Sequence, residues 1–214
     1  MLGRAGQGSR GLNSGAGRFV AHLLSLLRPV LGAAILAILA AGTRESALVL
    51  SLALVACMTD YVDGPLARWS GSEGAVGRVL DSVCDAGFLA LVLAGMASAH
   101  VWSGANSNAA PAWRILDLLP LAALAISFNI YLVRMLVQQR RGQVPARTKH
   151  GHRAGIANYA LVLVGAMSMW PELTLPRRFL EFCCVAVAAL NLAAVRENVV
   201  LLFPPVTPGP TMRS

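Results

Sequence analysis

Long apolar runs, separated by short polar segments, set the pattern of this chain. Six of them are long enough, or nearly so, to cross about 30 Å of hydrocarbon as α-helices that rise about 1.5 Å per residue. They cover residues 22–42, 45–63, 78–100, 115–137, 154–170 and 179–203. The second and fifth are short or have polar ends, so the pattern predicts about six transmembrane helices, within a range of about five to seven. No useful stretch alternates as β-barrel strands do, and the predicted fold is an all-α, polytopic membrane helical bundle.

The composition favours a membrane protein as well. Of the 214 residues, 56% are hydrophobic and 13% are charged, and the mean hydropathy is +0.62. A soluble domain carries about 25% charged residues, and half of that leaves too little polar surface to face water. The four cysteines (Cys57, Cys84, Cys183 and Cys184) lie in apolar runs without the spacing of a disulfide framework or a metal site. These numbers exclude a disordered chain, a collagen-like fibre and a disulfide scaffold.

The basic residues predict how the chain is oriented. There are 18 Lys and Arg against 10 Asp and Glu, a net charge of +8. If the N-terminus is cytoplasmic, the basic residues outside are only Arg44, Arg114, Arg177 and Arg178. This bias predicts a cytoplasmic N-terminus in the cell (inner) membrane, with loops 101–114 and 171–178 outside. Trp102, Trp113 and Trp170 fit an aromatic belt at the outer interface. The arginines are scattered between apolar spans, so nucleic-acid binding is disfavoured.

The chain divides into one membrane domain and two terminal segments. Residues 1–18 are rich in Gly and Ser and predict a flexible basic arm that contacts anionic lipid. A signal peptide is the alternative for this region, but Arg28-Pro29 interrupts the apolar run that would form its core. Residues 19–203 form the membrane domain, and the Pro-rich segment 204–214 is expected to be disordered. No internal repeat is evident, which disfavours an inverted-repeat transporter.

The aspartates are concentrated at one helix–helix junction. Asp60 and Asp63 are spaced i,i+3 near the end of the second apolar run, and Asp81 and Asp85 are spaced i,i+4 at the start of the third. Residues at these spacings share one face of a helix. A short glycine-containing turn between the two runs is expected to fold the helices against each other. The four carboxylates then converge from two facing helix ends on the cytoplasmic side.

Such a cluster has a specific chemistry. Four close carboxylates at a membrane boundary need a cation between them, and oxygen-only ligands select hard divalent ions such as Mg²⁺ or Mn²⁺. Two such ions would clamp a phosphoryl or pyrophosphate group, and one carboxylate at the edge could act as general base. Gly64 and Gly77 lie one turn from Asp60 and Asp81 and leave room for a ligand. Arg68, one turn further on, can reach an anionic oxygen.

The complete pattern over residues 60–85 is D-x2-D-G-x2-A-R-x8-G-x3-D-x3-D. It resembles the signature of the CDP-alcohol phosphatidyltransferase family, with every fixed position filled. The upstream Ser25-Leu-Leu-Arg28 is similar to the hydroxyl-x-x-Arg element in the family's first membrane helix. With six spans in the same order, the resemblance extends over nearly the whole chain.

The resemblance implies a role for each matching residue. The implied metal ligands are Asp60, Asp63, Asp81 and Asp85, and Asp85 is also the implied proton acceptor. The residues implied to bind CDP-diacylglycerol are Gly64, Ala67, Arg68, Gly77 and Ser25. In the implied reaction an alcohol hydroxyl attacks the phosphoryl group attached to diacylglycerol, and CMP is released. The resemblance also implies a homodimer.

The segment 134–153 is rich in basic residues. Positive-inside topology and lipid headgroup binding account for most of them. A sharper hypothesis is that some of them bind the phosphate of the acceptor alcohol. The candidates are Lys149 and Arg153 in the segment, with Arg134 and Arg196 at helix ends. His150 and His152 are interpreted as solvated loop residues, because no carboxylate or cysteine in the sequence accompanies them as a metal site would need.

Several alternatives stay open at this stage. For the acceptor, glycerol 3-phosphate is the first choice because the basic segment suits a phosphorylated alcohol. Inositol phosphate follows, since Asp81-Ser-Val-Cys-Asp85 differs from the D-P-x-A-D form frequent in phosphatidylglycerophosphate synthases, and serine or phosphatidylglycerol is also possible. The rival function is a cation-coupled transporter that uses the four aspartates as an ion site. A purely structural interpretation of the aspartates is that they end or cap helices at the membrane surface.

Overall fold

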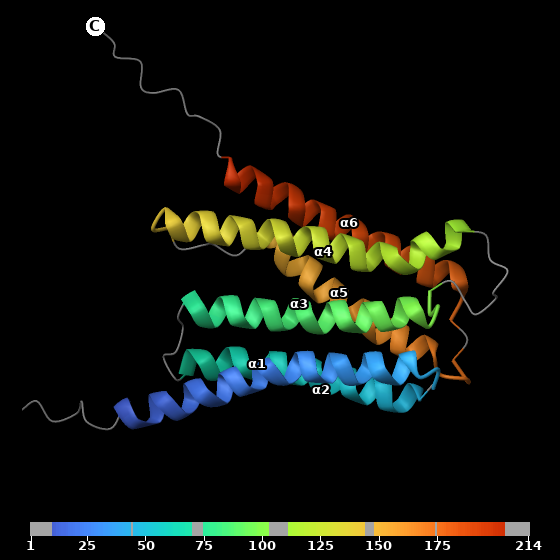
Figure 1. Cartoon of the computed structure of the whole chain (residues 1–214), viewed down its shortest axis with the longest axis horizontal. Helices are drawn as coiled ribbons and strands as arrows, with labels where there is room; N and C mark the ends of the chain where they lie inside the picture. The colour runs from blue at the N-terminus through green and yellow to red at the C-terminus, as the bar shows by residue number, and fades with distance from the viewer. Residues whose placement is uncertain are drawn as a thin grey trace, which may run out of the picture.

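The computed structural model describes residues 10–43, 45–69, 75–102, 111–143, 148–173 and 175–203. For residues 10–18, 21, 63–69, 75–76 and 111–114 it describes the helical backbone alone. All the regular structure in these ranges is helical. The helices are α1 (Arg10–Ala40), α2 (Ser46–Trp69), α3 (Ala75–Ser98), α4 (Pro111–Arg140), α5 (Lys149–Ser168) and α6 (Arg177–Leu202). The predicted all-α fold with six helices is confirmed over the described ranges (Figure 1).

Four of the described helices contain segments long and apolar enough to span a membrane. They are His22–Ala40, Gly77–Ser98, Ile115–Arg140 and Arg177–Leu202. The apolar part of α2 is shorter, Ser46–Val62, and α5 begins with the polar sequence KHGHR. These are the second and fifth apolar runs, the two that are short or have polar ends in the sequence. α1 begins at Arg10, so the expected arm over residues 1–18 overlaps this helix.

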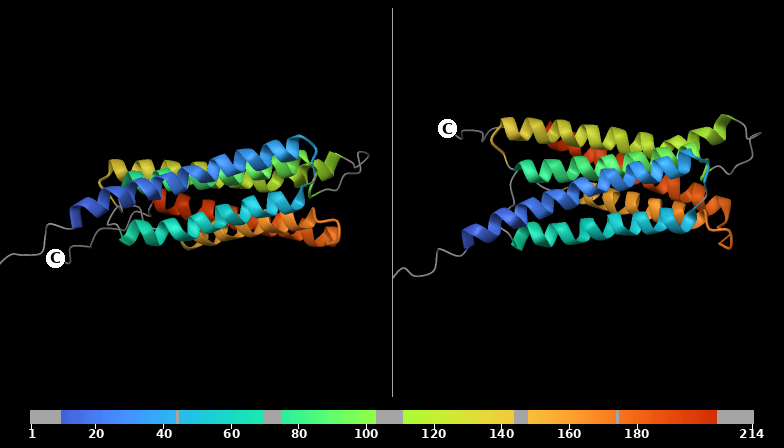
Figure 2. Two further views of the ribbon diagram at one scale, coloured as in Figure 1. Left: turned by 90° about the horizontal axis from the view of Figure 1, so that it is seen from below. Right: turned by 60° about the horizontal axis from the view of Figure 1, so that its bottom comes forward.

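The helices lie side by side and alternate in direction (Figures 1 and 2). One end of the bundle therefore gathers the starts of α1, α3 and α5 and the ends of α2, α4 and α6. This end is called the site end below, because the clustered aspartates belong to it. The described parts of the two predicted outer loops lie at the opposite end, where α3 and α5 end and α4 and α6 begin; they are residues 101–102, 111–114, 171–173 and 175–178.

The packing order differs from the order expected from the sequence. α1 packs against both α2 and α3, while α5 packs against α2, α3 and α6, and α4 packs against α3 and α6. Over the described residues, any direct contact between α2 and α3 is slight, and the turn that joins them lies outside these residues. The expected packing of α2 on α3 is therefore not one of the main contacts of the bundle. α1 and α5 each pack against both helices, and the clustered carboxylates meet beside α1.

Two glycines allow α1 and α3 to approach closely. A Cβ added at Gly32 would lie 3.1 Å from both the Cα and the carbonyl oxygen of Phe88. A Cβ added at Gly95 would lie 3.2 Å from the Cα of Leu36. Small residues at such positions let helix backbones come together in a membrane, where packing replaces the hydrophobic effect as the driving force. Arg28 lies one turn before Gly32, so the same approach brings it against α3.

Trp102 does not lie at an outer interface belt. It is 1% exposed and reaches the core beside Met96 and Gly165. The cause is the end of α3, where the Val101 amide donates to the Met96 carbonyl at 3.0 Å and His100 has a φ of 53°. This left-handed cap turns the chain back over the bundle and carries Trp102 inward. Trp170 is 38% exposed, and the side chain of Trp113 lies outside the described residues.

We expect Gly32→Ala to lower the free energy of unfolding by about 1–3 kcal/mol, because the new methyl group must push the backbone of α3 away. Gly155→Ala on α5 is the matched control, since nothing lies within 4 Å of a Cβ at that position. Its effect should be neutral or slightly stabilising, as alanine favours helix. Unfolding of both variants in detergent micelles measures the difference, and equal stability would contradict close α1–α3 packing at Gly32.

Candidate active site

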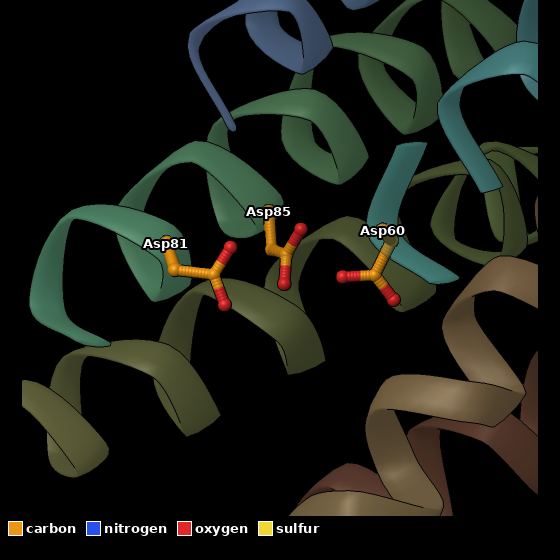
Figure 3. A group of neighbouring side chains, drawn as sticks. All are labelled: Asp60, Asp81 and Asp85. Atoms are coloured by element: carbon orange, nitrogen blue, oxygen red, sulfur yellow. The ribbon is translucent and has the colours of Figure 1, made fainter. Parts of the chain in front are cut away.

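Three of the clustered aspartates converge at the site end. Asp60 comes from α2, while Asp81 and Asp85 lie one turn apart on α3. One carboxylate oxygen from each of the three lies within 4.8 Å of the others. In Figure 3 the Asp60 carboxylate projects from α2 toward the two carboxylates on α3. The predicted meeting of carboxylates is therefore present for these three, whereas the side chain of Asp63 lies outside the described residues.

The helix-capping interpretation of these aspartates is excluded by their positions. α3 begins at Ala75, which places Asp81 in its second turn and Asp85 in its third. Asp60 precedes the end of α2, at Trp69, by more than two turns. A capping side chain satisfies amide groups only in the first turn of a helix. The carboxylates therefore project from helix interiors, and their convergence needs another cause.

That cause is the buried guanidinium of Arg28 on α1. The Arg28 side chain is 0% exposed, and its Nη1 donates to Asp60 Oδ1 at 2.9 Å. Arg28 also forms ion pairs with Asp81, through Nη2, and with Asp85, through Nη1. Ser25, one turn earlier on α1, accepts from Arg28 Nη2 and donates to Asp81 Oδ1, both at 3.3 Å. α1 thus ties α2 to α3 through one cation and one hydroxyl.

The charges of this cluster do not balance. Three carboxylates and one guanidinium leave two negative charges on these four groups. The carboxylate side chains are 27–41% exposed, while the guanidinium beneath them is buried. An all-oxygen donor set with surplus negative charge and an open side fits a hard divalent cation. Asp60, Asp81 and Asp85 could therefore hold such an ion on the side away from Arg28.

Asp85 has a further partner on α5. The Tyr159 hydroxyl donates to Asp85 Oδ1 at 3.0 Å. The Tyr159 ring stacks on Phe88, with ring centroids 5.6 Å apart and planes inclined by 19°. Phe88 is completely buried one turn along α3 from Asp85, so the hydroxyl is held by a rigid ring. Asp85 thus differs from the other two carboxylates in its surroundings.

The residues predicted to bind CDP-diacylglycerol lie around this cluster to different degrees. Ser25 contacts Asp81 directly, and Gly77 lies one turn before Asp81 on α3. Gly64, Ala67 and Arg68 belong to the last turns of α2, and their side chains lie outside the described residues. Cys84, between Asp81 and Asp85 on α3, is buried.

A second buried arginine lies near the cluster, on α4. Arg134 is 1% exposed, and its guanidinium carbon lies 5.8 Å from the centre of the Tyr131 ring. The Tyr131 hydroxyl is 3.2 Å from the hydroxyl of Ser82, the neighbour of Asp81 on α3. Arg134 is therefore a buried helix residue that faces the bundle, linked through Tyr131 to the helix that carries two of the aspartates.

A carboxylate from α6 accepts hydrogen bonds from the N-terminus of α5. Glu197 accepts from the backbone amides of Lys149 at 3.3 Å and His150 at 2.9 Å, and its Oε2 lies 3.1 Å from His150 Nδ1. His150 and His152 lie in the first turn of α5, so interpreting them as loop residues was wrong. Because Glu197 fills this helix terminus, an anion could bind here only through side chains. Among the acceptor candidates, Lys149, Arg153 and Arg196 are exposed at this end.

Sequence reasoning missed two residues of the site. Arg28 was noted as part of a motif but was not assigned to the site, although a charged residue inside an apolar span is itself a signal of function. Tyr159 had no signal, because a tyrosine in an apolar helix is ordinary and its partner lies 74 positions away in sequence.

The comparisons with known proteins identify the family. The family model for CDP-alcohol phosphatidyltransferase matches residues 18–201. No curated protein and no solved structure gives a significant match to the chain. The chain belongs to the CDP-alcohol phosphatidyltransferase family, and with four long apolar helices among its described residues it is an integral membrane protein. This membership does not support the alternative of a cation-coupled transporter.

Removing Arg28 should destabilise the metal-free protein. In Arg28→Gln the three carboxylates lose their shared cation, and we expect the free energy of unfolding in EDTA to fall by about 3 kcal/mol. Added Mg²⁺ should recover part of this loss. Arg177→Gln is the control, because it removes an arginine from an exposed pair with Glu181, worth about 0.5 kcal/mol. Wild-type stability of Arg28→Gln in EDTA would contradict the conclusion that Arg28 holds the three carboxylates together.

Proposed function

We propose that this membrane protein transfers the phosphatidyl group of CDP-diacylglycerol to a phosphorylated alcohol and releases CMP. The acceptor we favour is glycerol 3-phosphate, with inositol phosphate second. The observation that carries the proposal is the convergence of Asp60, Asp81 and Asp85 around buried Arg28, within a chain that belongs to this family. The buried Arg134 near the same helix supports a negatively charged acceptor.

The carboxylates are proposed to hold two Mg²⁺ or Mn²⁺ ions. The ligands would be Asp60, Asp63, Asp81 and Asp85. When bound, such ions polarise the pyrophosphate of CDP-diacylglycerol and offset the charge of the leaving CMP. The proposed residues for CDP-diacylglycerol itself are Ser25, Gly64, Ala67, Arg68 and Gly77. The buried Arg28 supports the metal site, since it neutralises part of the carboxylate charge and keeps the side chains together.

Asp85 is the proposed general base. The acceptor hydroxyl gives its proton to the Asp85 carboxylate while its oxygen bonds to the phosphorus that carries diacylglycerol. The bond from that phosphorus to the bridging pyrophosphate oxygen breaks, and CMP leaves with this oxygen. Asp85 is suited to the role because it is the least exposed of the three described carboxylates, at 27%, and because Tyr159 holds it from α5.

The acceptor phosphate is proposed to bind between α4, α5 and α6. Arg134 would anchor it, with Lys149, Arg153 and Arg196 as the exposed basic residues at the rim. Glu197 already occupies the amides at the start of α5, so specificity for the acceptor must come from these side chains. Neighbouring guanidinium and ammonium groups suit a phosphate dianion better than the neutral hydroxyls of an unphosphorylated alcohol.

The site end is proposed to face the cytoplasm in the cell membrane. Of the 18 basic residues, 14 belong to this side of the chain, and the positive-inside rule then places it in the cytoplasm. There the diacylglycerol tails can stay among the lipids while the cytidine and the acceptor come from water. The homodimer implied by the family resemblance is part of the same proposal.

A direct assay tests the reaction and its acceptor. Purified protein with CDP-diacylglycerol and Mg²⁺ or Mn²⁺ should release CMP with glycerol 3-phosphate, and inositol phosphate should be the next best acceptor. Serine and phosphatidylglycerol complete the panel, and EDTA should abolish the release. The absence of metal-dependent CMP release with every acceptor would overturn the proposed function.

Asp85→Asn should lower kcat by at least about 100-fold, because it removes the proton acceptor. Binding of CDP-diacylglycerol, measured in parallel by ligand-dependent unfolding, should be largely kept. Asp117→Asn is the matched control, since it makes the same change at the opposite end of the bundle, where Asp117 contacts His100 at 3.1 Å. Near-normal turnover by Asp85→Asn would remove Asp85 from the role of base.

A further inference from the structure

We propose that Tyr159 is a positioning residue, whose hydroxyl fixes the orientation of the Asp85 carboxylate for proton transfer. The inference rests on the proposed function, because it assigns a residue that acts through the proposed base. It places a functional group on α5, a helix to which the aspartate motif does not extend.

The geometry distinguishes Asp85 from the other carboxylates. Arg28 contacts Oδ1 of each of the three aspartates. Tyr159 adds a second donor, at 3.0 Å, to Oδ1 of Asp85. The two oxygens of a carboxylate point in different directions, so donors on Oδ1 restrict the direction of Oδ2 as well. In the proposed role of Asp85, Oδ2 is the oxygen that accepts the proton.

The hydroxyl itself is held in place. The Tyr159 ring stacks on Phe88 of α3, which is completely buried and whose backbone lies against Gly32 of α1. Tyr159 therefore contacts α3 at two places: its hydroxyl bonds to Asp85, and its ring stacks on Phe88 in the next turn. A ring fixed in this way loses little further conformational freedom when the hydrogen bond forms.

A fixed orientation matters because proton transfer depends strongly on distance and angle. Arg28 also contacts Oδ1 of Asp85, but one contact point leaves the carboxylate able to turn about that contact. Tyr159 approaches from a different helix and supplies a second contact, which limits this turning. Without the hydroxyl, the carboxylate would rotate about its terminal bond, and only a fraction of the molecules would have Oδ2 in position.

The test is Tyr159→Phe, which keeps the ring and its stacking and removes only the hydroxyl. We expect kcat to fall about 10- to 100-fold, as for the loss of a hydrogen bond to a charged group, with the KM for CDP-diacylglycerol and for the acceptor within about twofold. Unfolding temperature and the binding of Mn²⁺, followed by its paramagnetic resonance signal, should stay at wild-type values. Tyr61→Phe is the matched control, because the Tyr61 side chain is 75% exposed.

A double variant shows whether Tyr159 acts through Asp85. In an Asp85→Asn background, Tyr159→Phe should cause no further loss of kcat, since the group it orients is gone. Wild-type kcat for Tyr159→Phe, an additive loss in the double variant, or a loss of Mn²⁺ binding in Tyr159→Phe would each overturn the inference while the proposed function stands. A wild-type protein that releases no CMP would overturn the proposed function and this inference with it.

Discussion

The burial of one guanidinium governs the rest of this structure. A charged group removed from water in a membrane protein is costly unless opposite charges surround it. Arg28 is 0% exposed, and carboxylates from two other helices meet that requirement. The carboxylates in turn need a cation, since three carboxylates within 4.8 Å of one another would repel. The contacts with Arg28 supply it. Neither set of charges is stable at this depth alone, and together they fix how α1, α2 and α3 lie.

The glycines of α1 and α3 act together with this ion cluster in fixing how the two helices pack. Gly32 follows Arg28 by one turn, so the face of α1 that carries the charge also carries the close approach to Phe88. Sliding α1 along α3 would separate Arg28 from its carboxylates and also move Gly32 from Phe88. Charge pairing and steric fit therefore specify one register. The register also fixes the position of Phe88, on which the ring of Tyr159 stacks.

The sequence predicts those parts of the molecule that depend on local spacing. Six apolar runs predict six helices, and i,i+4 spacing predicts that Asp81 and Asp85 share a face, because both follow from the geometry of a single helix. The packing of α1 against both α2 and α3 depends on contacts between distant segments, so the short connection between α2 and α3 does not reveal it. Trp102 was placed wrongly because a local cap, at His100, reversed the chain direction. Tyr159 could not be found at all, since only the fold brings α5 to Asp85.

The cluster is layered from the inside outward, and the layering separates structural from chemical roles. Arg28 is buried, Ser25 and Tyr159 are part of its surroundings, and the carboxylates above are 27–41% exposed. Arg28 and Ser25 on α1 and Tyr159 on α5 donate to these carboxylates from the helices that pack around α2 and α3. The buried groups thus hold the carboxylates in place, and the exposed part of the carboxylates is accessible to a ligand. The positive charge that brings Asp60, Asp81 and Asp85 together thus belongs to the protein itself, so their convergence follows from the packing of α1, α2 and α3.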